Sequence, residues 1–334
     1  MVNTKPYSDI KTGVIGSGIM GKNHARVYNE LSNLVCVSDT NGKVGKQVAN
    51  EHGVKFYEDY RDMLSEVDAV SIAVPTIFHK QIAENVANAG VHMLVEKPLS
   101  NNISDAQAIV NCAHDNSLVL AVGHIERHNP VVEYAKNQIE GGKWGKIITA
   151  SACRVSPYPS RITDVGAIFD ITIHDIDVLR YLFMSDIESV YCSGGSIHSK
   201  DHEEFVSLIL NFSNGAKGVC ETSWLTPIKI RELSLTCSSH FVKLDYINQS
   251  IDIKTSEYLN LNQDNLFSSS MEIKSNKIML PKQEPLKLEL EDFLNCVINN
   301  SKPLVDGNDA LTNIVVANAA LTSLQTEDKV KIIE

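Results

Sequence analysis

The glycine-rich turn Gly-Ser-Gly-Ile-Met-Gly constrains the fold of this chain more than any other segment. An apolar run, Thr12–Ile15, leads into it, and a helical pattern over Lys22–Leu31 follows. In this setting the first glycine permits a tight turn, the second lets the backbone approach a pyrophosphate, and the third lets helix and strand pack closely. The helix N-terminus adds free N–H groups. We therefore expect a dinucleotide to contact Gly16, Ser17, Gly18, Ile19, Met20 and Gly21.

An acidic residue follows the second expected strand, Leu34–Val37. This residue, Asp39, comes about twenty residues after the glycines and is followed by Thr40. A carboxylate there accepts hydrogen bonds from the ribose hydroxyls and repels a 2′-phosphate. The nearest following cation is Lys43, so the pattern favours NAD over NADP. The alternative is a glycine turn in an α/β fold that binds no nucleotide.

Short apolar runs alternate with helical patterns in the first part of the chain. Further strands are predicted at residues 69–74, 92–95 and 118–122, and helices at 80–89 and 104–114. Alternation of this kind is typical of a parallel sheet with helices on both faces. We predict that residues 1–123 form a parallel, doubly wound dinucleotide-binding domain, a Rossmann domain of the α/β class.

The pattern changes after Gly123, and the length of 334 residues allows a second core. Period-two alternation predicts antiparallel strands at 190–193, 205–212, 218–222, 232–237 and 241–245. Helices are predicted at 130–139, 175–183, 288–299 and 310–324, and a polar surface loop at 260–276. Residues 124–334 are thus expected to form an α+β domain with a large, open, mostly antiparallel sheet, which suggests a homo-dimer or homo-tetramer.

Composition narrows the partners and the compartment. The formal charge of -11 repels phosphate backbones, which disfavours nucleic acid and leaves a small molecule as the expected partner. No apolar run is long enough to cross a bilayer, and Met1–Ile10 lacks the features of a secretion signal. The seven cysteines are scattered without a CxxC pair, as expected for reduced thiols. We therefore expect a cytoplasmic protein without membrane contact.

Polar segments follow several of the strands predicted in the first domain. Ligands of open α/β sheets bind at these carboxyl ends, so Lys97, in Glu96-Lys97-Pro98, is placed where a nicotinamide would lie. The alternative is an ordinary surface lysine. The other residues expected to contact the cofactor here are Pro75, Thr76, His79 and Glu96. For His79, core packing is an equal alternative.

One further cluster carries acid–base potential in the second domain. Asp170, His174 and Asp177 are spaced i, i+4 and i+7, which places them on one face of an α-helix. A carboxylate one turn from an imidazole orients it, and histidine is a natural proton acceptor when a hydroxyl is oxidised. Zinc ligation is a competing interpretation, but no Cys or second His lies nearby, so we expect no metal. Helix capping by Asp170 and core packing of His174 is the remaining alternative.

Together these motifs resemble the Gfo/Idh/MocA family of sugar and cyclitol oxidoreductases over essentially the whole chain. The resemblance depends on the glycine turn, Glu96-Lys97-Pro98, Asp170 with His174, and the closing stretch 284–307. It implies NAD as cofactor, a sheet that commonly forms a dimer interface, and a mechanism without metal. Lys97 would hydrogen-bond the reacting hydroxyl and the nicotinamide ribose, and His174 would accept the hydroxyl proton. Asp170 would orient the sugar.

Two segments, 123–130 and 161–166, resemble the nucleotide-sugar members of that family. They imply oxidation of C3 of UDP-N-acetylglucosamine to a 3-keto sugar. Arginines suit a diphosphate through charge-assisted bidentate bonds, and the expected substrate contacts here are Arg127, Asn129, Arg154 and Arg161. The alternative is that Arg127 pairs with Glu126 or Asp164 and that Arg161 lies in solvent. The competing functions are a dehydrogenase of a free sugar or inositol, and a non-enzymatic nucleotide sensor.

Overall fold

The structure, a computed structural model, describes residues 5–158, 165–260 and 270–332. These residues form two compact units. The first unit contains 5–128, 165 and 284–318, and the second contains 129–158, 166–260, 270–283 and 319–332. The unit boundaries differ from the predicted division at residue 123, because 284–318 return to the first unit.

Packing explains this return. Helix α7 (Pro285–Asn299) contributes Leu290 and Phe293 to the same buried cluster as Val14 of the first sheet and Tyr28 of the helix beside it. Burying an aromatic side chain and a leucine contributes about 1.5–3 kcal/mol each. A division made along the sequence cannot detect such a contact between distant segments.

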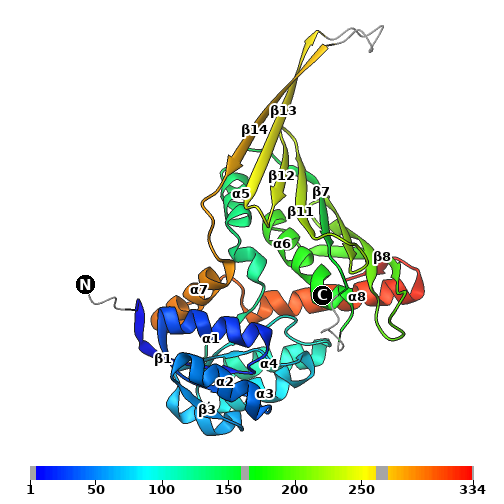
Figure 1. Cartoon of the computed structure of the whole chain (residues 1–334). Coiled ribbons are helices and arrows are strands. Elements are labelled where there is room, and N and C mark those ends of the chain that lie inside the picture. Colours follow the sequence, from blue (N-terminus) through cyan, green and yellow to red (C-terminus); the bar gives the residue numbers. More distant parts are fainter. Residues whose placement is uncertain (1–4, 159–164, 261–269, 333–334) are drawn as a thin grey trace. The chain divides into compact units, whose positions relative to one another are not determined.

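A six-stranded parallel sheet organises the described part of the first unit (Figure 1). Its order, β3-β2-β1-β4-β5-β6, is that of a dinucleotide-binding doubly wound fold, so the prediction for this domain is confirmed. The strands are β1 (Tyr7–Ile15), β2 (Ser32–Ser38), β3 (Lys55–Tyr57), β4 (Ala69–Ile72), β5 (His92–Val95) and β6 (Leu120–Val122). The helices are α1 (Ile19–Leu31), α2 (Gly42–His52), α3 (His79–Asn88) and α4 (Ile103–Asp115).

A nine-stranded sheet forms the described part of the second unit, in the order β14-β13-β12-β11-β7-β10-β9-β8-β15. Its described ladders are antiparallel except the parallel pair β7–β10, which confirms the mostly antiparallel sheet. The strands are β7 (Ile147–Val155), β8 (Ile187–Gly195), β9 (Phe205–Phe212), β10 (Lys217–Ser223), β11 (Ile230–Cys237), β12 (Phe241–Asp245), β13 (Ser250–Asn260), β14 (Ser270–Met279) and β15 (Val330–Lys331). The helices are α5 (Pro130–Glu140), α6 (Ile173–Phe183) and the last turns of α8 (Gly307–Thr326).

The loop predicted at 260–276 is wrong over residues 270–276, which belong to strand β14. Residues 261–269 lie outside the described part. Almost every side chain of β14 is exposed, so the strand lacks the apolar alternation that identifies a half-buried strand. Figure 1 shows the β13–β14 hairpin extending beyond β12.

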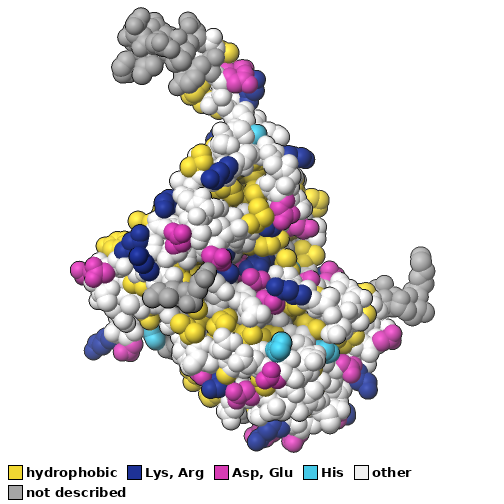
Figure 2. Space-filling model, turned by 180° about the vertical axis from the view of Figure 1, so that it is seen from behind, with side chains coloured by type: hydrophobic (Ala, Val, Ile, Leu, Met, Phe, Trp, Pro, Cys, Tyr) yellow, Lys and Arg dark blue, Asp and Glu magenta, His cyan; other side chains and the backbone are white. Residues whose placement is uncertain are grey.

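The two faces of the second sheet differ. Along β9 the side chains of Val206, Leu208 and Leu210 are buried, whereas those of Phe205 and Ile209 are exposed. Helix α6 contacts β7 and α5 contacts β12. Figure 2 shows hydrophobic side chains among charged ones below the hairpin. One face is therefore packed, and the other carries exposed apolar side chains.

Candidate active site

In the glycine turn after β1 the first and last glycines pack against the protein, and the middle one does not. Gly16 has a φ of +91°, and a Cβ there would lie 2.4 Å from the carbonyl oxygen of Ala73. A Cβ on Gly21 would lie 1.8 Å from the carbonyl oxygen of Gly16. At Gly18, by contrast, a Cβ would meet no described atom within 4 Å. The backbone at Gly18 is therefore accessible to a ligand.

The start of α1 supplies hydrogen-bond donors beside this opening. Within the described residues no side chain caps α1 at Gly18, and its first turn carries no acidic residue. The hydroxyl of Ser17 is buried and has no hydrogen-bond partner in the described part. Unpaired N–H groups and a hydroxyl at a helix N-terminus fit a pyrophosphate. These residues of the chain therefore suit an NAD pyrophosphate.

The carboxylate of Asp39 lies beside the turn, at the end of β2. Its Oδ2 accepts a hydrogen bond from the Ser17 N–H at 2.7 Å, and its Oδ1 accepts one from the Asn41 N–H at 2.7 Å. A carboxylate has about four acceptor positions, so capacity remains for ribose hydroxyls. The side chain predicted to select NAD thus adjoins the phosphate turn.

Replacing Asp39 by Ala is expected to weaken NADH binding about 10- to 100-fold, because hydrogen bonds to a charged group contribute about 1.5–3 kcal/mol. NADPH binding should weaken less or improve, since the repelling charge is gone. Fluorescence titration with both nucleotides measures the ratio of their dissociation constants. Asp59→Ala is the matched control, because Asp59 caps another helix of the same unit and pairs with Arg61. An unchanged ratio would exclude Asp39 from cofactor selection.

Buried contacts hold the loops that follow β4 and β5. His79, 1% exposed, lies with its Nδ1 3.0 Å from the carbonyl oxygen of Pro98 and its Nε2 3.0 Å from that of Val74. Burial lowers the pKa of His79, although its carbonyl contacts oppose the shift. These contacts favour the packing alternative for His79. Lys97 is half-buried, and its backbone N–H donates to Glu96 Oε2 at 3.2 Å.

Asp170 and His174 do not share one regular α-helix. A π-helix, Ile168–Thr172, contains Asp170, and α6 begins after it, so the predicted i, i+4, i+7 face is wrong in its geometry. A π-turn has a wider hydrogen-bond repeat than an α-turn and occurs frequently at functional sites. His174 is 8% exposed, and Asp170 is only partly buried. Both residues nevertheless belong to one continuous helical segment.

Glu203, which sequence reasoning missed, holds the start of this π-helix. Its Oε1 accepts a hydrogen bond from the Ile168 N–H at 2.8 Å, and its backbone carbonyl accepts one from the Ala167 N–H at 2.9 Å. A Cβ on Gly166 would lie 2.2 Å from the carboxylate, so a side chain at position 166 would displace Glu203 from this place. Burial raises the pKa of Glu203. No local motif marks this glutamate, because its partners lie more than thirty residues earlier in the chain.

Glu203→Ala should lower the free energy of unfolding by about 1–3 kcal/mol, because the Ile168 N–H loses its acceptor. Glu203→Gln keeps an acceptor oxygen, so its free energy of unfolding should fall less than that of Glu203→Ala. The raised pKa means that the folded state favours the protonated carboxyl. Its contribution to stability is present below the ordinary value of 4.5 and is lost as the pH rises through the raised value. Urea unfolding over a pH series should show the free energy of unfolding falling more steeply with rising pH in wild type than in Glu203→Gln. Parallel curves for the two proteins would contradict this.

Two of the predicted substrate arginines bind carboxylates of the protein. The Nε of Arg154 donates to both oxygens of Asp175 at 3.1 Å, and its Nη2 donates to Oδ1 at 2.9 Å. The side chains of this pair are 3% and 1% exposed. Releasing the guanidinium to a diphosphate would take this counter-charge away from buried Asp175, and breaking a buried pair costs about 3–5 kcal/mol. The structure therefore assigns Arg154 a structural partner in place of the predicted phosphate contact.

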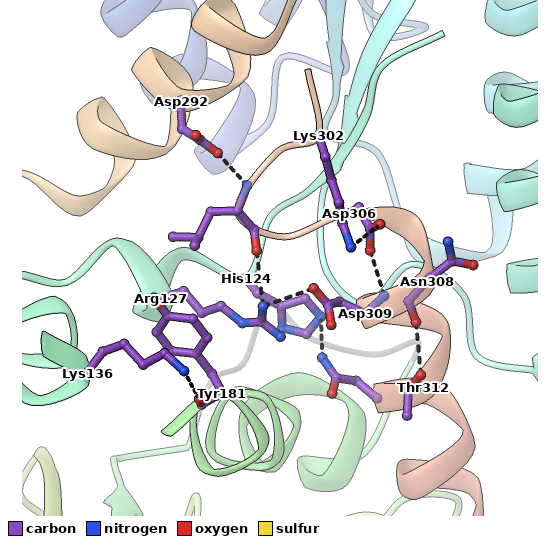
Figure 3. Close-up of polar contacts among 12 residues, drawn as sticks. His124, Arg127, Lys136, Tyr181, Asp292, Lys302, Asp306, Asn308, Asp309 and Thr312 are labelled. Carbon is purple, nitrogen blue, oxygen red and sulfur yellow. Dashed lines mark hydrogen bonds and ion pairs between the residues drawn. The ribbon is translucent and has the colours of Figure 1, made fainter. Parts of the chain in front are cut away.

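Arg127 is held in the same way (Figure 3). Its Nη1 donates to Asp309 Oδ2 at 3.0 Å and to the carbonyl oxygen of Leu304 at 3.1 Å. The alternative interpretation paired Arg127 with Glu126 or Asp164, whereas the carboxylate seen here belongs to Asp309, 182 residues away in the chain. Arg161 lies outside the described residues.

The remaining predicted substrate residue, Asn129, also has protein partners. Its Oδ1 accepts from the Val131 N–H at the start of α5, and its Nδ2 donates to the carbonyl oxygen of Tyr246 at 3.2 Å.

Two absences apply to the described part alone. No group of three or more His, Cys, Asp or Glu is placed there to hold a metal ion. No helix in those ranges has the length and apolar character needed to cross a bilayer.

A phosphate-binding turn on the first βα unit, an acid at the end of β2 and a second unit with a large mixed sheet define a two-domain dinucleotide-binding protein. Residues 10–124 match the family described as "Oxidoreductase family, NAD-binding Rossmann fold", and residues 132–240 match "GFO/IDH/MocA C-terminal domain". The chain belongs to the Gfo/Idh/MocA family. It is thus an NAD-dependent oxidoreductase of the kind that acts on a CH–OH group, as the motifs predicted.

Several relatives are named as dehydrogenases of sugars or cyclitols. UDP-N-acetylglucosamine 3-dehydrogenase from Acidithiobacillus ferrooxidans is 29% identical over 89% of this chain and 92% of its own length. A crystal form of that enzyme superposes with a TM-score of 0.86 at 27% identity, covering 95% of this chain and 98% of the other. A scyllo-inositol 2-dehydrogenase (NAD(+)) from Bacillus subtilis is 29% identical over 95% of this chain and 94% of its own.

Proposed function

We propose that this protein oxidises the C3 hydroxyl of UDP-N-acetylglucosamine to a ketone, with NAD as the hydride acceptor. The observation that carries the proposal is the similarity, in sequence and in fold, to an enzyme named for that reaction along nearly the whole chain. The open turn at Gly18 and the adjacent Asp39 carboxylate support the cofactor half of the reaction.

Three side chains carry the proposed chemistry. NAD, held by the glycine turn and Asp39, would supply the hydride acceptor. His174 accepts the hydroxyl proton at its imidazole, so that the C–O bond gains double-bond character as the hydride leaves. Lys97 donates a hydrogen bond to the same oxygen, and Asp170 binds and orients the sugar.

We assign recognition of the diphosphate to a single arginine. Because Arg127 and Arg154 have protein partners, we assign them to the support of the fold, and of the predicted arginines we retain Arg161 for the diphosphate. Loss of Arg161 should therefore raise KM for the UDP-sugar and leave the KM for NAD unchanged.

The direct test is NADH formation at 340 nm with NAD and a panel of UDP-N-acetylglucosamine, its uronate, free glucose, myo-inositol and scyllo-inositol. Turnover of UDP-N-acetylglucosamine, with NMR showing the ketone at C3, is the expected result. The inositols are included because of the similar inositol dehydrogenase. Turnover with an unphosphorylated polyol alone would replace the proposal by that alternative. NADH binding without any turnover would favour the nucleotide sensor.

We also propose that the protein is a cytoplasmic homo-dimer or homo-tetramer formed through the open face of the second sheet. Ile209 and Val219, opposite each other in the β9–β10 ladder, are each 42% exposed on that face. Exposed apolar side chains on a β-sheet are a common feature of interfaces. Light scattering after size exclusion would measure the mass, and a monomer would contradict the proposal.

A further inference from the structure

A chain of buried polar side chains links α1 to the segment that carries Lys97. Tyr28 Oη lies 2.8 Å from Ser71 Oγ, which in turn lies 2.8 Å from His24 Nδ1. His24 Nε2 lies 2.9 Å from Glu96 Oε1, and Glu96 Oε2 accepts the backbone N–H of Lys97. The first three residues are fully buried and Glu96 is 7% exposed. The four contacts form one continuous path.

One arrangement of protons satisfies every contact in this path. The hydroxyl of Tyr28 donates to Ser71, whose own hydroxyl donates to Nδ1 of His24. The imidazole then carries its proton on Nε2 and donates a hydrogen bond to Glu96, whose two oxygens both accept when the carboxyl is ionised. A buried polar network in which every member is satisfied is rigid, whereas one missing a partner is costly.

The glutamate is built into this network. Burial alone would raise the pKa of Glu96, but the hydrogen bond from His24 and the nearby charge of Lys97 hold it below its ordinary value. A Cβ on Gly123 would lie 2.9 Å from Glu96 Oε2, so a side chain at position 123 would press against the carboxylate. Glu96 thus has one oxygen committed to His24 and the other to the backbone at Lys97.

We propose that His24 is a positioning residue for the reaction. Through Glu96 it holds the backbone at Lys97, and so sets the point from which the flexible lysine side chain reaches the reacting hydroxyl. His79 holds the carbonyl group of Pro98, the next residue. Misplacement of a catalytic group by about 1 Å costs on the order of 10²-fold in rate. This inference rests on the role proposed for Lys97.

Two substitutions of His24 distinguish the hydrogen bond to Glu96 from the space that the side chain fills. In His24→Gln the amide nitrogen reaches the place of Nε2 and can still donate to Glu96. In His24→Asn the shorter side chain reaches the place of Nδ1, near Ser71, and loses Glu96. We expect His24→Asn to lower kcat about 10- to 100-fold with the KM for NAD unchanged, and His24→Gln to retain most of the wild-type kcat. Tyr28→Phe, which removes the far end of the path alone, should leave kcat nearly unchanged.

Hydrogen–deuterium exchange of the peptide spanning residues 92–99 provides a measurement that does not need turnover. Exchange there should be faster in His24→Asn than in wild type, with little change in Tyr28→Phe. Equal kcat values for His24→Asn and His24→Gln would overturn the positioning role and leave His24 as a core residue. Faster exchange throughout the first unit in His24→Asn would do the same. If wild type turns over no substrate, the proposed function fails, and the exchange measurement still decides whether His24 anchors Lys97.

Discussion

Replacing Lys97 by Ala is expected to lower kcat for the sugar substrate about 10²- to 10⁴-fold, the range typical of a positioned acid–base or hydrogen-bonding group. The half-buried lysine lies two residues after the end of β5, at the edge of the sheet where ligands of such folds bind. NADH binding should persist, because the phosphate turn and Asp39 lie on other segments. Initial rates at 340 nm and NADH fluorescence titration measure the two effects separately.

The matched control is Lys80→Ala. Lys80 is a lysine of α3 in the same unit, 42% exposed and paired with Asp105. It should retain full activity, since exposed ion pairs contribute little to stability. His174→Asn should reproduce the loss seen for Lys97→Ala. Near-normal turnover in Lys97→Ala would remove it from the mechanism, and equal loss of NADH binding would make it a cofactor residue alone.

Replacing Arg154 by Ala is expected to lower the free energy of unfolding by about 3–5 kcal/mol, because it breaks a buried ion pair and leaves the Asp175 carboxylate inside the protein. The guanidinium also lies 5.2 Å from the ring centroid of Tyr246, and the substitution removes this cation–π interaction as well. The double variant Arg154→Met with Asp175→Leu should recover most of the stability, since apolar replacement of a buried pair is often neutral. Urea unfolding measures all three proteins.

The exposed pair Lys55–Glu66 offers the comparison, because its side chains are 63% and 33% exposed. Lys55→Ala should change stability by no more than about 1 kcal/mol. The opposite result for Arg154→Ala, unchanged unfolding but a large rise in KM for the UDP-sugar, would restore the diphosphate contact predicted from the sequence.

Local chemistry explains why the first domain was predicted well. Gly21 packs against the carbonyl oxygen of Gly16 within one βα unit, and Gly16 itself has a φ of +91°, so the glycine spacing identifies the turn without any knowledge of the sheet. The apolar runs of the first sheet are buried and continuous, which makes them visible as strands. Strand β7, which the sequence did not reveal, carries small buried residues, Ala150 and Ala152, and these give weak apolar alternation.

The spacing of the residues did not predict the π-helix at Asp170. A spacing of i, i+4 and i+7 predicts one face only if the helix has 3.6 residues per turn. The wider turn depends on how the segment is held, and Glu203 holds its start. The spacing therefore identified the two residues of interest, while their relative orientation followed from a partner elsewhere in the chain.

By itself the sequence determined the two-domain class, the dinucleotide turn, the acidic residue expected to select the cofactor, and the family. These features depend on residues close together in the chain. Only the tertiary structure decided which side chains pair: Arg154 with Asp175, Arg127 with Asp309, and His24 with Glu96. The last two pairs join residues 182 and 72 positions apart. Such contacts depend on the order of strands and on the return of residues 284–318 to the first unit, which no local pattern of hydrophobicity or charge encodes.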